Sequence, residues 1–269
     1  MGEPSAICIV PARLGSTRLP GKVLLSETGH PLLWHVVETA RRAVCVGDVV
    51  VACDDESIGA AIEAYGVRWV LTRGDHPNGT SRIAEACDVL GIDDDAIIVN
   101  VQGDEPELAP GVIDEAVKVL ASSGAPVATA AHPIVNVDVF ENPNIVKVAR
   151  RVDGSALYFS RAPIPHARGH GTGFTSALHH IGMYVYRRSF LREYVGLAPT
   201  PLEEAERLEQ LRILEHGFEI AVALIPVASG EELQTHGHLL SMGGIDTAEQ
   251  YAAFVERWRM GGAGQAYSS

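Results

Sequence analysis

The sequence AICIV at residues 6–10 runs directly into PARLGSTRLPGK at residues 11–22, and this junction decides the fold. A short apolar run bounded by turn residues predicts a fully buried strand of a sheet that is covered on both faces. The segment that follows is therefore a loop at the carboxyl end of a strand, which is where open α/β sheets bind their ligands.

This loop has the composition of a polyphosphate site. It carries three cations, Arg13, Arg18 and Lys22, which can neutralise an anion. Gly15 and Gly21 let the backbone approach closely and turn amide N–H groups toward a phosphate. The alternative is an ordinary basic surface loop.

Two better-known phosphate loops do not fit. A P-loop has four residues between its glycines and then Lys-Ser or Lys-Thr. Here five residues separate Gly15 from Gly21, and Lys22 is followed by Val23. The dinucleotide pattern G-x-G-x-x-G is also absent from this loop.

The composition predicts a globular protein whose main partner is neither nucleic acid nor an anionic membrane. The 269 residues are 46% hydrophobic, which is enough for a sizeable core. A formal net charge of −13 argues against nucleic acid or an anionic membrane, because both require a basic face. An anionic ligand must therefore bind in a locally basic pocket.

The cysteines and the apolar segments indicate where the protein works. Cys8, Cys45, Cys53 and Cys87 show no C-x-x-C spacing and predict small buried side chains in a reducing compartment. The N-terminus lacks the pattern of a signal peptide, and no apolar stretch is long enough to span a membrane. We therefore expect a cytoplasmic protein.

Helices and strands alternate after the first loop, as in a mostly parallel α/β sheet. The apolar patterns predict helices at residues 31–44, 58–64, 83–90 and 111–120, and strands at residues 48–52, 67–71 and 96–101.

Two further polar loops end strands of this sheet. Residues 72–82 and residues 102–106 should lie beside the first loop at the same edge, and the helix after residues 72–82 adds positive charge at its N-terminus. Asp104 emerges at this edge. A carboxylate would be repelled by a bound triphosphate unless a divalent cation lay between them, which suggests Mg²⁺. An acidic turn before a helix is the alternative.

The pattern changes after residue 125, where short strand-like runs follow one another. Asp153 and Gly154 between two such runs predict a hairpin. We expect an antiparallel excursion at about residues 125–190, forming the acceptor pocket and a dimer surface. The runs lie at residues 127–131, 146–149, 156–159 and 180–186.

The C-terminal part predicts two helices. A capping box from Thr200 to Glu203 begins one that should continue unbroken through residue 216, and a strand at residues 219–227 follows. Asp246 is the expected N-cap of the final helix. His236 and His238 resemble a metal pair only weakly, so a surface loop is favoured there. We expect one domain over residues 1–262 and a flexible tail at residues 263–269.

Along nearly the whole chain, motifs occur in an order that resembles the sugar-acid cytidylyltransferases. Within that group the resemblance is to the CMP-Kdo synthetase family, where Kdo stands for 3-deoxy-D-manno-octulosonate. The motifs are PARLGSTRLPGK, TRGDHPNGTSR, VNVQGDEP, NPNIVKV, LYFSRAPIP, HHIGMYVYR, LEQLR and GIDT. The resemblance implies a Rossmann-like nucleotidyltransferase fold of the GT-A type. It also implies transfer of CMP from CTP to the anomeric hydroxyl of Kdo, with release of pyrophosphate, by a Mg²⁺-dependent cytosolic homodimer that serves lipopolysaccharide biosynthesis.

The resemblance also implies roles for individual residues. The nucleotide site would comprise Arg13, Ser16, Arg18, Lys22, Arg73, Asp75, Thr80, Arg82 and Gln102. Lys22, Asp104 and Asp246 would be catalytic, and the two aspartates would hold Mg²⁺. The sugar-acid pocket would comprise Arg161, His180, Tyr184, Glu209 and Gln210.

The sequence departs from the family pattern at several positions. Val23 replaces a proline, Asn78 a serine, Ser81 an acid and Ala248 a proline, and residues 228–243 form a longer connection than usual. Because that connection leads into the GIDT motif, we hypothesise that it reshapes the sugar side of the site. A related acid, such as an amino-Kdo or a sialic-type nonulosonate, is the alternative acceptor.

Two other classes fit less well. A transferase for hexose 1-phosphates would not need the histidine and tyrosine pair in HHIGMYVY. A regulator that only binds nucleotide would not need both Asp104 and Asp246.

Overall fold

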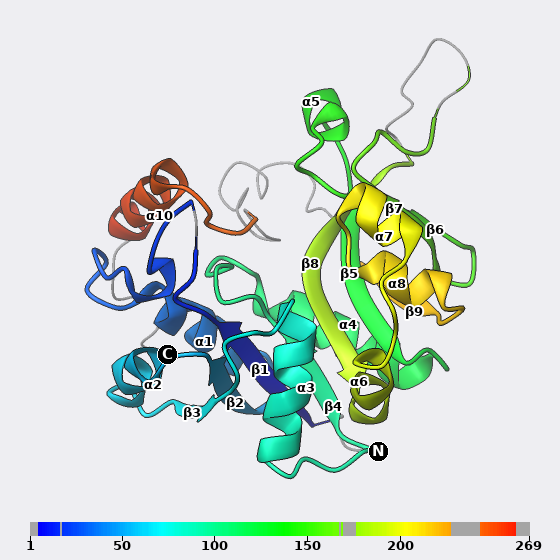
Figure 1. The fold of residues 1–269 in the computed structure, drawn as a ribbon. Helices are drawn as coiled ribbons and strands as arrows, with labels where there is room; N and C mark the ends of the chain where they lie inside the picture. Colours follow the sequence, from blue (N-terminus) through cyan, green and yellow to red (C-terminus); the bar gives the residue numbers. More distant parts are fainter. Residues whose placement is uncertain (1–4, 17, 167, 169–175, 227–242, 262–269) are drawn as a thin grey trace.

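The computed structural model describes residues 5–16, 18–166, 168, 176–226 and 243–261. Within these ranges the strands form one nine-stranded mixed sheet with helices on both faces (Figure 1). The strand order is β3-β2-β1-β4-β8-β5-β9, and β6 and β7 pair beside β8.

The first half of the chain builds the parallel part of the sheet, as the sequence predicts. It contains β1 (Ala6–Ala12), β2 (Val46–Cys53), β3 (Arg68–Leu71) and β4 (Ile97–Asn100), all paired in parallel. Cys8, Ile9 and Val10 of β1 are completely buried, which confirms a strand that is covered on both faces. Because these strands run in one direction, the loops after β1, β3 and β4 meet at one edge.

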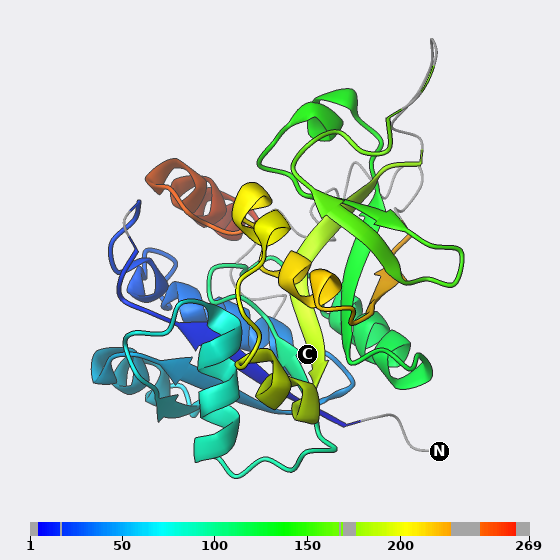
Figure 2. The same cartoon turned by 45° about the vertical axis from the view of Figure 1, so that its right-hand side comes forward.

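The second half adds the predicted antiparallel part, which contains β5 (Val127–Pro133), β6 (Lys147–Arg150), β7 (Ala156–Ser160) and β8 (Leu178–Arg187). The last strand, β9 (Ile220–Leu224), pairs in parallel with β5 at the edge of the sheet. β8 runs antiparallel between β4 and β5, and the β6–β7 hairpin projects from this side of the molecule together with α5 (green, Figure 2). Gly154 in the hairpin turn has φ 97°, a conformation that favours glycine.

The helices pack on the two faces of the sheet. α1 (Leu32–Arg41), α2 (Glu56–Glu63) and α4 (Pro110–Ser122) bury their apolar side chains in one core, and α3 (Gly79–Val89), α6 (Arg188–Tyr194) and α8 (Gln210–Glu215) in the other. Cys8 and Val10 belong to the first core and Ile9 to the second, as alternation along a strand requires. The remaining elements are a 3-10 helix (Lys22–Leu24), α5 (Val137–Glu141), α7 (Pro201–Glu206) and α10 (Ala248–Met260).

The unbroken helix predicted for residues 202–216 is wrong, because two short helices, α7 and α8, occupy this segment. Arg207 separates them with φ 56° and ψ 47°, a left-handed conformation that ends a helix. The preceding Glu206 accepts hydrogen bonds from Ser160 Oγ at 2.5 Å and from Arg161 N at 2.9 Å. These contacts with the end of β7 fix the break, although the sequence has neither glycine nor proline there.

Two predicted helix starts are also wrong. Thr247, and not Asp246, is the N-cap of α10, because its side chain accepts from Gln250 N. Helix α3 begins at Gly79, four residues before the predicted start of 83, because Asn78 Oδ1 accepts from Ser81 N at 2.8 Å. Helices α5 and α6 are not among the helices that the sequence predicts.

The prediction for the cysteines is confirmed, because all four are free and buried, as small apolar side chains would be. Over the residues that the structure describes, we find no helix that combines the length and the apolar character needed to cross a membrane. His236, His238, most of residues 228–243 and the tail at residues 263–269 lie outside the described residues.

Candidate active site

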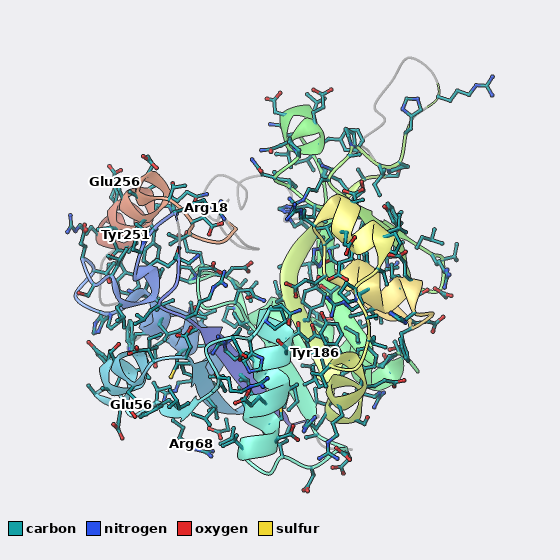
Figure 3. The ribbon with its side chains drawn as sticks, viewed as in Figure 1. Arg18, Glu56, Arg68, Tyr186, Tyr251 and Glu256 are labelled. Carbon is teal, nitrogen blue, oxygen red and sulfur yellow. The ribbon has the colours of Figure 1, made fainter. Side chains whose placement is uncertain are left out.

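A cavity of about 580 Å³ opens at the carboxyl edge of the parallel strands. Figure 1 shows the loop after β1 and helix α10 on one side of this edge, with α7 and α8 on the other. In Figure 3, Arg18 lies on the α10 side and Tyr186 on the β8 side. Predicted site residues that line this first cavity are Arg13, Ser16, Arg18, Lys22, Arg82, Gln102, Asp104, Arg161, Glu209 and Asp246.

The three polar loops meet as the sequence predicts. A Cβ added to Gly103 would lie 2.8 Å from Pro11 O, and one added to Gly79 would lie 3.3 Å from Pro11 Cγ. The loop after β4 and the N-terminus of α3 therefore pack directly against Pro11 at the carboxyl end of β1, where the first loop begins. A larger residue at Gly103 would collide with the backbone of Pro11.

Lys22 lies at the centre of the charged cluster. Its Nζ donates to Asp104 Oδ2 at 2.5 Å, to Asp246 Oδ1 at 2.9 Å and to Ile245 O at 3.1 Å. Arg18 Nη2 lies 2.7 Å from the other oxygen of Asp246. Because Thr247 caps α10, the Asp246 carboxylate is available for these ion pairs, and two carboxylates converge on one cationic group.

The two carboxylates fit a hard divalent cation. Across the ranges that the structure describes, no group of three or more His, Cys, Asp and Glu side chains could hold a metal ion. Asp104 and Asp246 each place one oxygen within hydrogen-bond distance of the Lys22 ammonium. Mg²⁺ commonly binds to one or two carboxylates together with the phosphates of a substrate. The donor set is therefore suited to Mg²⁺ that arrives with a nucleotide.

The nucleotide residues predicted in the second loop separate into two groups. Arg82 is 4% exposed, and burial lowers its pKa, although Asp54 opposes this shift. Its Nη1 donates to Thr72 Oγ1 at 2.6 Å, so the guanidinium is held at the cavity wall. Arg73 and Asp75 are exposed, lie 3.7 Å apart and line neither cavity. The structure does not bring these two residues to the site.

A second cavity of about 300 Å³ adjoins the first, and Gly79, Gln102 and Glu209 line both. Hydroxyl, amide and imidazole groups dominate its polar lining, which suits a polyhydroxylated acceptor. Thr80 was predicted for the nucleotide site, but it lines this second cavity. Predicted residues that line the second cavity are Thr80, Gln102, His180, Tyr184, Glu209 and Gln210. The same wall contains four polar residues that the sequence motifs do not predict for the site, Asn100, Tyr186, Tyr194 and Arg207.

The protonation states in the second cavity follow from its surroundings. Burial lowers the pKa of His180 to about 3, with a smaller contribution from His179, so the imidazole is neutral. Burial also raises the pKa of Tyr184 well above 10, which keeps its hydroxyl a donor. Desolvation and the nearby Glu203 raise the pKa of Glu209, against Arg212 and Arg13, although the residue is exposed at the cavity.

Arg161 joins three segments around the first cavity. Its Nε donates to Glu206 O at 2.9 Å, its Nη1 to Pro143 O at 3.2 Å and its Nη2 to Arg207 O at 3.4 Å. Although Arg161 was predicted for the sugar pocket, it lines the cavity of the charged cluster. Three of its five N–H groups hold backbone carbonyls, and two remain for a ligand.

Lys147 is a further residue that the sequence analysis did not single out. It is completely buried, and its Nζ donates to Asn142 O, Ile145 O and Arg161 O at 3.0, 2.7 and 2.6 Å. All three of its protons are therefore used to fix the turn beside Arg161. A lysine between valines in NPNIVKV was the available signal, since a charged residue inside an apolar strand must find buried partners.

The parallel sheet, the basic loop after its first strand and the two adjoining cavities define an α/β protein of the nucleotidyltransferase type. A family model described as cytidylyltransferase matches residues 7–220. The chain therefore belongs to the cytidylyltransferase family.

Relatives and solved structures agree with this assignment. The chain is 49% identical over 239 residues to the 3-deoxy-manno-octulosonate cytidylyltransferase of Methylibium petroleiphilum, covering 84% of this chain and 89% of that protein. It is 47% identical over 247 residues to the Acidovorax ebreus protein of the same name, covering 86% and 93%.

Among solved structures, CMP:2-keto-3-deoxy-manno-octonic acid synthetase complexed with CTP matches with a TM-score of 0.84 and 34% identity, covering 96% of this chain and 99% of the other. A cytidylyltransferase from Leptospira borgpetersenii matches with a TM-score of 0.58 and 20% identity, covering 96% and 88%, and supports the fold alone.

Proposed function

We propose that this protein transfers CMP from CTP to the anomeric hydroxyl of 3-deoxy-D-manno-octulosonate, forming CMP-Kdo and pyrophosphate. The observation that carries the proposal is the pair of adjoining cavities. The first contains Arg13, Arg18 and Lys22 beside two aspartates, as a metal-bound triphosphate requires. The second offers neutral polar groups to a sugar. The names and coverage of the relatives support the same acceptor.

The reaction needs charge screening and orientation. An anomeric hydroxyl is a weak nucleophile, and the α-phosphate is surrounded by negative charge. In this proposal Arg13, Arg18 and Lys22 bind the triphosphate, which lowers the repulsion that an approaching oxygen meets. The second cavity holds the sugar so that its anomeric oxygen faces the α-phosphorus in line with the leaving pyrophosphate.

We infer that Asp104 and Asp246 hold Mg²⁺ together with phosphate oxygens. When bound, Mg²⁺ screens the phosphates and stabilises the leaving pyrophosphate. Lys22 and Arg18 offset the charge of the two carboxylates, since the Lys22 ammonium contacts both and Arg18 Nη2 lies 2.7 Å from Asp246. With Mg²⁺ bound to the carboxylates, the Lys22 ammonium would be available to the phosphates.

The acceptor is held by groups with defined protonation states. The neutral imidazole of His180 and the tyrosine hydroxyl of Tyr184 can bind sugar hydroxyls without a charge penalty. Glu209 and Gln210 follow the break at Arg207, which places both in the wall of the second cavity. We assign Arg161, at the first cavity, to the carboxylate of the sugar acid through its two remaining N–H groups.

Three wider features belong to the same proposal. A CTP-consuming enzyme works where nucleotides are made, so we place the protein in the cytoplasm, with its product serving lipopolysaccharide biosynthesis. We also propose a homodimer that uses the antiparallel part, where the β6–β7 hairpin exposes Val152 and Leu157. A net charge of −13 disfavours nucleic acid or an anionic membrane as partner.

Pyrophosphate release in the presence of CTP and Mg²⁺ tests the proposal. Kdo is offered in one reaction and N-acetylneuraminate in another. Release with Kdo alone is expected. Release with N-acetylneuraminate alone would assign the protein to a sialic-type acceptor, and binding of CTP without release in either reaction would show that Kdo is not the substrate.

A further inference from the structure

Thr129 is a buried residue behind the second cavity. It lies in β5 and is completely buried. The pairing of β5 with β8 shifts immediately after it, from Thr129 opposite Tyr184 to Ala130 opposite Ile181. Two residues of β8 between these partners, Gly182 and Met183, are therefore left out of the regular ladder.

The hydroxyl of Thr129 contacts three groups of this irregular segment. Its Oγ1 lies 2.7 Å from Met183 O, 3.2 Å from Ile181 O and 2.9 Å from His180 Nε2. Both carbonyl oxygens can only accept hydrogen bonds, and Thr129 has one proton to donate.

This arrangement determines which nitrogen of His180 carries hydrogen. If Thr129 donated its proton to Nε2, two oxygen lone pairs would face each other across the 2.7 Å between Oγ1 and Met183 O. If it donates to Met183 O instead, Nε2–H donates to Oγ1, and the two shortest contacts are both hydrogen bonds while Ile181 O lies farther away at 3.2 Å. The neutral ring then has its lone pair at Nδ1.

The ring of His180 is also fixed by packing. Its centroid lies 5.0 Å from that of Phe159, in an edge contact, and 5.5 Å from that of Tyr184. The side chain lines the second cavity. Among the described residues no hydrogen bond to Nδ1 is present, which leaves this nitrogen for a ligand.

We propose that Thr129 is a positioning residue of the acceptor site, which holds His180 as the Nε2–H tautomer so that Nδ1 accepts a hydrogen bond from an acceptor hydroxyl. The inference rests on the proposed function, because it takes the ligand of the second cavity to be a polyhydroxylated sugar acid. His180 thereby recognises a hydroxyl as a donor, and a sugar that lacks this hydroxyl binds less tightly.

A double-mutant cycle tests the proposal. Thr129→Val keeps the shape of the side chain and removes both hydrogen bonds, whereas Thr129→Ser keeps the hydroxyl. We expect Thr129→Val to lower kcat/KM for the acceptor by about tenfold with KM for CTP unchanged, and Thr129→Ser to restore most of it. In a His180→Ala background Thr129→Val should have no further effect on acceptor kcat/KM. An equal loss in both backgrounds would show a purely structural role and overturn the proposal.

The tautomer is measured directly by ¹⁵N NMR of histidine-labelled protein without substrates, with His180→Ala identifying the signal. We expect Nε2 protonated and Nδ1 unprotonated in the wild type. The opposite tautomer would overturn the proposal even if Thr129→Val did not fold. The NMR measurement does not depend on turnover. If the wild-type protein fails to use Kdo, the proposed function is refuted, and the NMR spectrum still decides which tautomer His180 adopts.

Discussion

Replacing Glu206 by glutamine tests how the break between α7 and α8 supports the acceptor site. Glu206 Oε1 accepts from Ser160 Oγ at 2.5 Å, and Oε2 accepts from Arg161 N at 2.9 Å. Hydrogen bonds from Ser160 and Arg161 lower the pKa of this carboxyl, although partial burial opposes them. The carboxylate is therefore ionised and accepts at both oxygens.

Glutamine offers one acceptor oxygen and one NH₂ group. If its NH₂ faces Arg161 N, two donors oppose each other. If it is flipped, the NH₂ group faces the Ser160 hydroxyl, which then accepts from it and from Ala162 N and no longer donates to a charged acceptor. Either arrangement loses one hydrogen bond to a charged group, which costs about 1.5–3 kcal/mol of unfolding free energy.

The same change should reach the acceptor site, because Arg207, Glu209 and Gln210 follow Glu206 directly. We expect acceptor kcat/KM to fall about tenfold and KM for CTP to stay unchanged, since a loss of about 1.4 kcal/mol in positioning suffices. Urea denaturation gives the stability, and pyrophosphate release gives the kinetics. Glu204→Gln, on the exposed side of α7, is the matched control. Equal stability of the two variants, or a loss confined to CTP, would refute the reasoning.

Three further changes test other parts of the site. Asp104→Ala should lower kcat about 1,000-fold, because charge screening by a bound metal contributes several kcal/mol at the transition state. The control Asp95→Ala should leave kcat unchanged, and near-normal activity of Asp104→Ala would refute the metal assignment. The pKa of His180 is about 3 in the folded protein and 6.5 in the unfolded protein, so the unfolded state takes up the proton first and the free energy of unfolding falls as the pH drops through 6.5. Between about pH 7.5 and about pH 4 the wild type should lose about 3 kcal/mol more unfolding free energy than His180→Gln, measured by urea denaturation. Equal losses in the two proteins would contradict a buried neutral imidazole. Because the backbone of Arg207 has a left-handed conformation, Arg207→Gly should be about 1 kcal/mol more stable than Arg207→Ala. Equal urea midpoints of the two variants would show that the backbone is unstrained there.

The sequence predicts the parallel half of the fold because each local signal there agrees with the tertiary structure. β1 is an unbroken apolar run, and the polar loops after β1 and β4 end at one edge by the topology alone. The contact between Lys22 and Asp104, far apart in the chain, follows from that edge. It could therefore be anticipated without any side-chain geometry.

Features that depend on distant partners could not be predicted in this way. The break at Arg207 has no local signal, because Ser160 and Arg161 in another part of the chain fix it through Glu206. The role of Thr129 depends on a register shift between two strands, which no pattern within β5 encodes. Asp246 is the N-cap that the sequence predicts, but its carboxylate pairs with the distant Lys22 ammonium and with Arg18, and Thr247 caps α10 instead.

The most direct test of the central claim is the identification of both products by ³¹P NMR after incubation with CTP, Kdo and Mg²⁺. Attack of the anomeric oxygen on the α-phosphorus predicts one phosphodiester resonance, from CMP-Kdo, and pyrophosphate in equal amounts. Free CMP with pyrophosphate from the outset, or CDP with inorganic phosphate, would mean that water attacks or that another bond breaks, and would contradict the account.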